Sequence, residues 1–353
     1  MKRIVFTADI QAENHPVDGV QHEGMNSRLW SCVESIRQGA QKARGGILVI
    51  NGDLFDNRKV IEIDVLTAIH EAVYRASLTL EHIYIVVGNH DQWLRDGRIH
   101  STSIFSGIPR ITVVADDMIV KLGSAEYADM VLCMHAFTTD LERIQRFITK
   151  CAYDKTLSLA RKVLVLHTSV DGARIGKSVS TGGMSLGSLE PDSFDRVLLG
   201  HYHKPQALRQ NVLYIGSPYQ TDRSEAGEEK RFIAFSRKEG WHDIPVEGMP
   251  EYRVFTDAKK FKKWRESSRE EGRPSFDVVD VLCDEESYEE VVANSGGIPL
   301  IRISVSHDVT SAFEISDSGE KALDELSIPS SVKAYLERNG RDHLVEASIA
   351  RLK

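Results

Sequence analysis

Short apolar runs that stop abruptly in polar residues recur along the first two thirds of the chain. Four or five consecutive apolar residues, bounded by glycine or polar residues, are typical of strands buried on both faces of a sheet. Segments with apolar residues at helical spacing separate several runs and predict helices over 28–43, 62–78 and 138–162. Strands that alternate with helices predict a layered α/β fold. The strand-like runs are IVFTAD (4–9), ILVINGD (47–53), IYIVVGNHD (83–91), VLCMH (131–135), VLVLH (163–167), VLLGHYH (197–203) and LYIGSP (213–218).

The pattern changes near residue 250. A connecting strand in GMPEYRVF precedes a highly charged helical segment at 257–274, and FDVVDVLC and PLIRISVSH have the pattern of strands in a small second unit. SDSGE (316–320) has the composition of a linker, and SSVKAYLERNG in the tail has a helical pattern. We therefore expect three parts: a first domain over 1–248, a small α+β capping domain over 249–315, and a linker with a helical tail over 316–353.

Length and composition set limits on the class of protein. A chain of 353 residues is longer than one hydrophobic core usually supports, so more than one domain is expected. A composition of 41% hydrophobic and 27% charged residues is usual for a water-soluble globular protein. No apolar run approaches the roughly 20 residues of a membrane span, and MKRIVFTADI enters a strand without a signal-peptide pattern. We expect a cytoplasmic protein without membrane contact. Four cysteines stand far apart, so neither a disulfide framework nor a thiolate zinc site is expected.

The formal net charge is −8, from 44 Lys and Arg against 52 Asp and Glu. This is the wrong sign for a protein that holds nucleic acid through its overall charge. A polyanionic substrate would have to meet local cations or bound metal.

Polar side chains suited to metal binding follow five of the predicted strands. In layered α/β sheets ligands collect at the carboxyl ends of strands, so we expect these side chains to meet. Carboxylates, an amide oxygen and imidazoles, without sulfur, are the donors that a pair of divalent first-row metals takes. Each residue alone is more simply a hydrogen-bonded interior residue, but GD, GNHD, a strand-end histidine and GHxH in this order are hard to obtain through packing. The candidates are Asp9, Gln11, Asp53, Asn89, His90, Asp91, His167, His201 and His203.

The motifs GDLFD (52–56), GNHD (88–91) and GHYH (200–203) resemble the signature of the calcineurin-like metallophosphoesterases. The resemblance covers roughly residues 1–245 and implies a layered β-sandwich flanked by helices. The spacing, the early Asp9 motif, the extended capping region and the length resemble most the SbcD-type nuclease subunit of double-strand-break repair complexes, including its phage-encoded relatives.

Carried over residue by residue, the resemblance implies a site for two divalent cations that Asp53 bridges. One cation would be held by Asp9, Gln11, Asp53 and His203, and the other by Asp53, Asn89, His167 and His201. His90 would reach the scissile phosphate without binding metal, and Asp91 would orient His90.

The resemblance also implies an activity and partners. Nucleases of the SbcD type hydrolyse DNA phosphodiesters with a metal-bridging hydroxide. They act as 3′ to 5′ exonucleases on double-stranded ends and as endonucleases at blocked or hairpin ends. Such activity belongs to DNA end processing, repair and recombination. The metals are usually manganese, with magnesium as the alternative. The implied partners are duplex DNA ends, a second copy of the chain and an SbcC-type coiled-coil ATPase.

Gln11 departs from the family pattern, which has histidine at this position. An amide oxygen is a harder, neutral and usually weaker ligand, acceptable to manganese or magnesium and poor for zinc. We expect a weakened rather than an abolished first site, since Asp9, Asp53 and His203 remain. Replacement of Gln11 by His15 or His22 is less favoured, because both lie in a polar loop.

Two further residues lie near the motifs. His135, at the end of VLCMH, has no counterpart among the family ligands and is expected at the rim of the site. Asp56 either approaches substrate or caps the helix that follows it.

Three surfaces have two readings each. A basic stretch would contact DNA phosphates or form a solvated helix face; its members are Lys259, Lys260, Lys262, Lys263 and Arg265. Apolar tail residues would dock on the ATPase or pack on their own chain; they are Leu326, Val332, Tyr335 and Leu336. The apolar stripe of segment 62–78 would form a homodimer or pack on the sheet; it comprises Ile63, Leu66, Ile69 and Val73.

Two rival functions remain at this stage. The same chemistry could act on a small phosphodiester or phosphomonoester, in which case activity would respond weakly to salt. Alternatively, the fold could be a degenerate, non-catalytic scaffold, with Gln11 as the first sign of decay. The retained His90 argues against a scaffold, because a scaffold has no use for a histidine that binds no metal.

Overall fold

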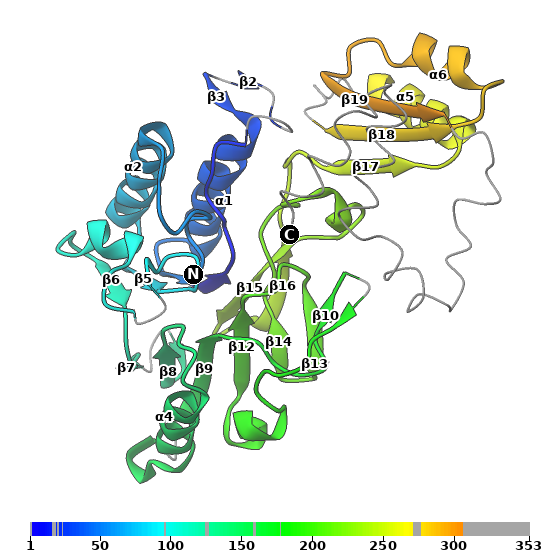
Figure 1. Cartoon of the computed structure of the whole chain (residues 1–353). Coiled ribbons are helices and arrows are strands. Elements are labelled where there is room, and N and C mark those ends of the chain that lie inside the picture. Colours follow the sequence, from blue (N-terminus) through cyan, green and yellow to red (C-terminus); the bar gives the residue numbers. More distant parts are fainter. Residues whose placement is uncertain are drawn as a thin grey trace, which may run out of the picture.

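Two six-stranded mixed sheets form the body of the molecule (Figure 1). The computed structural model describes residues 2–15, 19, 21–22, 24–94, 97–123, 127–157, 160–176, 178–270 and 277–305. The first sheet has the order β16-β15-β1-β4-β5-β6, in which β1, β4, β5 and β6 are parallel and β15 and β16 are antiparallel additions. Its strands are β1 (Ile4–Thr7), β4 (Ile47–Asn51), β5 (His82–Val86), β6 (Ile111–Val114), β15 (Arg231–Ser236) and β16 (Gly240–Pro245).

The second sheet has the order β13-β14-β12-β9-β8-β7. Its four inner strands are parallel, and the edge strands β7 and β13 run antiparallel to their neighbours. The strands are β7 (Met118–Lys121), β8 (Met130–His135), β9 (Arg161–His167), β12 (Arg196–Gly200), β13 (Gln206–Arg209) and β14 (Val212–Tyr214). Two short hairpins complete this part: β2 (Gln21–His22) with β3 (Met25–Asn26), and β10 (Arg174–Ile175) with β11 (Ser178–Val179).

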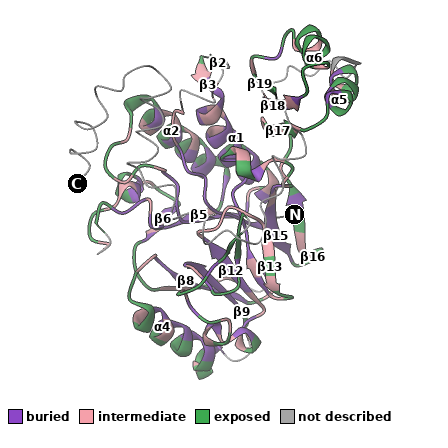
Figure 2. Cartoon of the chain, turned by 45° about the vertical axis from the view of Figure 1, so that its right-hand side comes forward, coloured by how far each residue is buried: buried purple, intermediate pink, exposed green. Residues whose placement is uncertain are grey.

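Helices cover the outer faces of both sheets, which gives four layers. Helices α1 (Ser27–Ala43) and α2 (Ile63–Thr79) share a core with the first sheet, and α4 (Leu141–Tyr153) shares one with the second. A third core fills the space between the sheets, where Phe6 and Val49 of the first meet Leu132 and Val165 of the second. Figure 2 shows the strands buried and the outer sides of the helices exposed. The predicted layered α/β sandwich flanked by helices is confirmed.

Local sequence explains where the helices begin and end. The Asn26 side chain caps α1 by accepting from the Arg28 N–H at 2.8 Å, and Arg44 ends this helix in the left-handed region with φ 53°. Asp140 caps α4 through the Arg143 N–H at 2.9 Å. The predicted helix over 138–162 is too long, because α4 ends at Tyr153 and strand β9 already begins at Arg161.

A third, smaller sheet follows the body and forms the cap (Figure 1). Strands β17 (Tyr252–Phe255), β18 (Val278–Cys283) and β19 (Leu300–Val305) are parallel, and α5 (Ala258–Glu270) and α6 (Tyr288–Asn294) pack on them around Phe261. The cap is attached through the Tyr252 N–H, which donates to Gln220 Oε1 at 2.7 Å, and through an ion pair of Arg223 with Asp280. The expected boundary at residue 248 falls in the connection between β16 and β17.

The predicted tail from residue 316 onward lies outside the described residues. None of the helices within the described part of the chain combines the length and apolar character needed to cross a bilayer.

Candidate metal centre

Strands from both sheets deliver polar side chains to one edge of the sandwich. Asp9 follows β1, Asp53 follows β4, Asn89 follows β5, His167 ends β9 and His201 follows β12. Strands β1, β4 and β5 of the first sheet are parallel, and so are β9 and β12 of the second, so the carboxyl ends within each sheet lie at the same edge. The structure therefore brings together residues that are up to 192 positions apart in the chain.

The side-chain atoms of this group are within contact distance of one another. His167 Nε2 lies 3.2 Å from Asp53 Oδ2, 3.0 Å from Asn89 Oδ1 and 3.9 Å from Asp9 Oδ1. His201 Nδ1 lies 2.7 Å from Asn89 Oδ1, and the Asp9 carboxylate accepts from the His201 N–H at 2.9 Å. One ligand atom each from Asp53, His167 and His201 can be chosen so that all lie within 4.8 Å of one another. This spacing suits a shared cation.

Strained backbone holds several of these side chains in place. Asp9, Gln11, Asp53 and His201 have φ values of 53°, 51°, 51° and 103°, in the left-handed region that non-glycine residues seldom adopt. Such conformations cost of order 1–3 kcal/mol each and cluster at functional sites. Their concentration among the candidate ligands indicates that the surrounding structure is built to aim these side chains.

The motif glycines are required because other atoms occupy the space of a side chain. A Cβ on Gly52, which has φ +82°, would lie 2.1 Å from His167 Nδ1. A Cβ on Gly200 would lie 2.3 Å from the Asn51 carbonyl oxygen and 2.7 Å from His167 Nδ1. The glycines of GD and GHxH therefore allow the two sheets to approach closely around the His167 ring.

Burial and mutual charge strongly shift the pKa values of the site. Burial raises the pKa of Asp9 to about 6, whereas the His167 charge and hydrogen bond outweigh burial and hold the pKa of Asp53 at about 2. Although burial opposes it, the carboxylates of Asp53 and Asp9 raise the pKa of His167 to about 9. Burial, together with the charge of His167, lowers the pKa of His201 to about 4. Without a cation, a proton on His167 balances the buried carboxylates.

The donor atoms around His167 fit a divalent metal. His167 Nδ1 lies 2.8 Å from the Asn51 carbonyl oxygen and must donate its proton there. Its Nε2 faces oxygens of Asp53 and Asn89. In the neutral ring all three of these atoms carry lone pairs, so a proton or a cation must lie between them. A site made of nitrogen and oxygen atoms, without sulfur, suits divalent first-row metals and does not suit soft metal ions.

Gln11 points into the same site. Its side-chain N–H donates to Asp53 Oδ2 at 3.0 Å, while its buried Oε1 has no hydrogen-bond partner. A buried acceptor without a partner costs about 1–3 kcal/mol. The amide oxygen is therefore available to a cation.

His203 interacts electrostatically with Asp9, and its Nδ1 already has hydrogen-bond partners. Thr221 Oγ1 lies 2.8 Å and Glu225 Oε1 lies 3.0 Å from this nitrogen. Burial lowers the pKa of His203, but the hydrogen bond that its ring donates to the Glu225 carboxylate and the charge of Asp9 raise the pKa overall. Sequence reasoning did not identify Thr221 or Glu225, because no motif marks them.

The contacts of His90 and Asp91 correct one expectation. Asp91 was expected to orient the His90 ring, but its carboxylate accepts from the Phe55 N–H at 3.1 Å and the Gly88 N–H at 2.9 Å. It therefore ties the GDLFD and GNHD loops together. The His90 ring is held instead by the Asp56 carbonyl oxygen, 2.6 Å from Nδ1. Helix α2 begins after Glu62, so Asp56 is not its cap.

Other predicted residues lie away from this group. His135, the last residue of β8, is buried, and its ring lies 3.4 Å from the Asp117 carboxylate. On α5, Lys259, Lys260, Lys262 and Lys263 are exposed, with Lys262 paired to Glu290 at 2.7 Å. Arg265 is only 8% exposed and donates to the Gly296 carbonyl oxygen, so it packs within the cap. The tail residues Leu326, Val332, Tyr335 and Leu336 lie outside the described residues.

Comparison with known proteins agrees with this geometry. Residues 2–205, more than half of the chain, match the family model described as calcineurin-like phosphoesterase. Members of this family are metal-dependent hydrolases of phosphoesters, which accounts for the cluster of Asp53, His167 and His201. This protein belongs to the calcineurin-like phosphoesterase family.

Proposed function

We propose that this protein is a DNA nuclease that hydrolyses phosphodiester bonds at double-strand ends with two divalent cations, manganese being the most suitable. The observation that carries the proposal is the meeting of Asp53 with His167 and His201, where a carboxylate and imidazoles from separate strands converge. When bound, such cations supply Lewis-acid polarisation of the phosphate and lower the pKa of a water molecule.

The side chains divide into two sets around Asp53. In the proposed assignment, Asp9, Gln11 and His203 would hold one cation with Asp53, and Asn89, His167 and His201 would hold the other. Neutral or weak ligands such as Gln11 and Asn89 suit manganese or magnesium better than softer metals. The backbone strain and the motif glycines keep these ligands in place before metal binds.

His90 is the proposed proton donor to the leaving oxygen. Its ring donates through Nδ1 to the Asp56 carbonyl oxygen, its side chain is 35% exposed, and its Nε2 has no hydrogen bond among the described residues, which suits contact with substrate. A positioned general acid typically contributes about 10²- to 10⁴-fold to the rate. Asp91 contributes indirectly, because it holds the loop that carries His90.

Exposed lysines on the cap favour DNA over a small phosphoester. The net charge is −8, so DNA must be attracted by local cations. The lysines of α5 supply such a group; they are Lys259, Lys260, Lys262 and Lys263. Arg265 does not belong to this face, because it is buried and donates to the Gly296 carbonyl oxygen.

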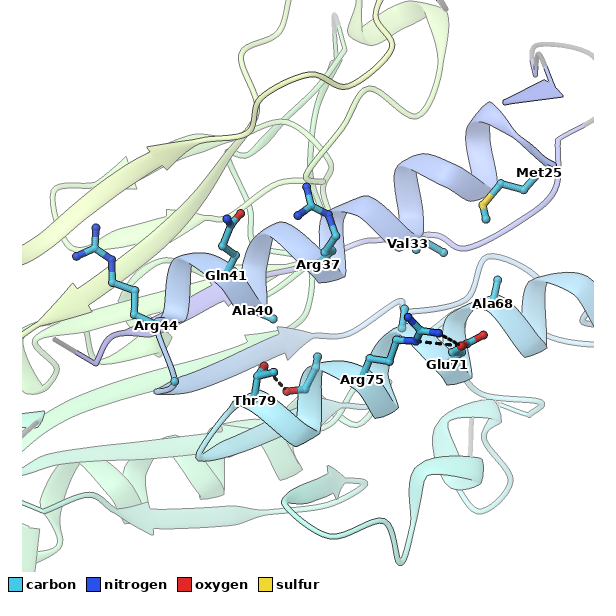
Figure 3. A pocket seen from close by; sticks show the side chains of 13 residues that line it. Met25, Val33, Arg37, Ala40, Gln41, Arg44, Ala68, Glu71, Arg75 and Thr79 are labelled. Atoms are coloured by element: carbon cyan, nitrogen blue, oxygen red, sulfur yellow. Dashed lines mark hydrogen bonds and ion pairs between the residues drawn. The ribbon is translucent and has the colours of Figure 1, made fainter. Parts of the chain in front are cut away.

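A second copy of the chain is the proposed partner for the groove between α1 and α2. This groove is a cavity of about 660 Å³, and its lining includes Val33, Ala40, Ala68 and Ala72. Figure 3 shows its two walls, with Val33 and Ala40 on α1 and Ala68 on α2. Ile63, which is 76% exposed, and Leu78 add apolar surface along α2. The polar rim includes Arg37 and the Arg75–Glu71 ion pair. We retain an SbcC-type ATPase as the proposed partner of the tail.

Digestion of end-labelled duplex DNA tests the function directly. With Mn²⁺ the parent protein should shorten the duplex, and chelation should stop the reaction. His90→Ala should still bind metal but cut about 10²- to 10⁴-fold more slowly. Activity should fall steeply as salt rises. Hydrolysis of small phosphoesters without salt-sensitive cutting of DNA would favour the small-molecule function, and unchanged cutting by His90→Ala would remove the role given to His90.

A further inference from the structure

A short turn after β14 places a buried carboxylate behind His203. Glu225, which is 5% exposed, ends the 3-10 turn Arg223–Glu225. Its Oε1 lies 3.0 Å from His203 Nδ1, and Thr221 Oγ1 lies 2.8 Å from the same nitrogen. Glu225 and Thr221 lie beyond the part of the chain that matches the family, which ends at residue 205.

The hydrogen bonds around His203 fix the position of its ring proton. The Thr221 hydroxyl donates its single proton to Glu225 Oε1, so its oxygen can offer only lone pairs to the histidine. The carboxylate likewise only accepts. Nδ1 of His203 must therefore be the donor, and in the neutral ring Nε2 carries the free lone pair.

A buried lysine balances the charge of this carboxylate and fastens it to the same loop. Lys230 Nζ lies 2.7 Å from Glu225 Oε2 and donates to the His203 carbonyl oxygen at 3.0 Å. The Thr221 N–H also donates to Glu225 Oε2, at 2.9 Å. A buried carboxylate with these partners has little freedom to rotate away from the ring.

We propose that Glu225, assisted by Thr221, is a positioning residue that holds the His203 ring in the tautomer whose Nε2 can bind a divalent cation. Carboxylates behind metal-binding histidines orient the ring and raise its basicity, and their loss commonly costs 10- to 100-fold in metal affinity. The inference deepens the proposed function and rests on His203 being a ligand of the first cation.

The test uses the full chain, two variants that should fold, and a matched control. Glu225→Gln keeps the shape but can turn its amide N–H toward Nδ1, and Thr221→Val removes one acceptor while leaving the Glu225–Lys230 pair intact. Glu228→Gln is the control, because Glu228 contacts Lys230 at 3.1 Å and has no hydrogen bond to His203 among the described contacts. Mn²⁺ alone is titrated by calorimetry, and ring ¹⁵N NMR shifts report the His203 tautomer in metal-free protein.

The parent should bind two Mn²⁺ ions and show the Nδ1–H tautomer. Glu225→Gln should lose about 10- to 100-fold in affinity at one of the two sites and show a mixed or reversed tautomer, and Thr221→Val should show a smaller loss in the same direction. The Glu228→Gln control should match the parent. The proposal would be overturned if Glu225→Gln and Thr221→Val both kept the Mn²⁺ affinity and the His203 tautomer of the parent. It would also be overturned if the Glu228→Gln control lost as much affinity as Glu225→Gln. If the parent binds no Mn²⁺, the proposed function is refuted. The NMR comparison of the His203 tautomer between the parent and Glu225→Gln would then still show whether Glu225 positions the ring.

Discussion

Replacing Gln11 by methionine tests whether its amide oxygen binds metal. Methionine has similar length without branching, and its soft sulfur is a poor ligand for Mn²⁺. The change removes the buried Oε1, which has no partner, and the N–H that donates to Asp53 Oδ2 at 3.0 Å.

The magnitude follows from the state of that oxygen. Leaving a buried acceptor unpaired costs about 1–3 kcal/mol, and a cation that binds Oε1 recovers this cost. Losing the interaction should therefore weaken one metal site by about 5- to 150-fold, since 1.4 kcal/mol is a factor of ten. In metal-free protein the lost hydrogen bond to Asp53 and the removed unpaired oxygen offset each other, so the free energy of unfolding should change by less than about 1 kcal/mol.

Calorimetric titration with Mn²⁺ measures the affinity, and thermal unfolding in chelator measures the stability of the metal-free protein. Gln11→His, the companion variant, should bind one Mn²⁺ more tightly than the parent, because an imidazole nitrogen replaces a neutral oxygen. If Gln11→Met binds two Mn²⁺ with the affinities of the parent, Gln11 does not contact metal and the reasoning fails.

Three further predictions address the site and its surfaces. Despite burial, the carboxylates of Asp53 and Asp9 raise the pKa of His167 to about 9, so below that pH a cation must displace a ring proton. Mn²⁺ affinity should rise by up to about tenfold per pH unit between pH 7 and 9 and then level off, and a pH-independent affinity in calorimetry would contradict this. Alanine at Lys259, Lys260 and Lys263 should weaken duplex binding and reduce the slope of log K against log salt by about one per lost phosphate contact. Lys262→Ala, already paired with Glu290, should change the slope least, and an unchanged slope in the triple variant would exclude this face. Ala72→Arg in the α1–α2 groove should convert a dimer to a monomer in light scattering, whereas Gln145→Arg on α4 should not; an Ala72→Arg dimer would place the interface elsewhere.

The strands, and the position of the candidate ligands at one edge of the sandwich, could be predicted because their signals are local. Each buried parallel strand is a run of apolar residues, and the residues after it necessarily lie at the sheet edge. The glycines of GD and GHxH report a close approach of backbone to the His167 ring. Such features are readable without knowledge of what packs against them.

The arrangement of strands into two sheets could not be predicted in the same way. Strands such as β4 and β9 are buried on both faces, so their composition does not show which sheet they join. The chain returns to the first sheet with the antiparallel strands β15 and β16 only after it has formed the second sheet. Strand β16 is also only partly buried. Their place depends on pairing between residues far apart in the chain.

The partners of the site residues depend on tertiary contacts in the same way. Glu225 meets His203 across a turn without a recognisable motif, and Asp91 bonds to backbone N–H groups instead of the neighbouring histidine ring. Arg265 belongs to a basic stretch in sequence, but its helical position turns it toward Gly296. A charged residue therefore cannot be assigned to a binding face from a local charge pattern alone.

Anomalous X-ray diffraction from crystals soaked in Mn²⁺ tests the central claim most directly. Two peaks should appear about 3.5–4 Å apart, as in other two-metal sites, with the Asp53 carboxylate between them and His167 beside one of them. No peak near Asp53, or peaks only at distant surface carboxylates, would contradict the account.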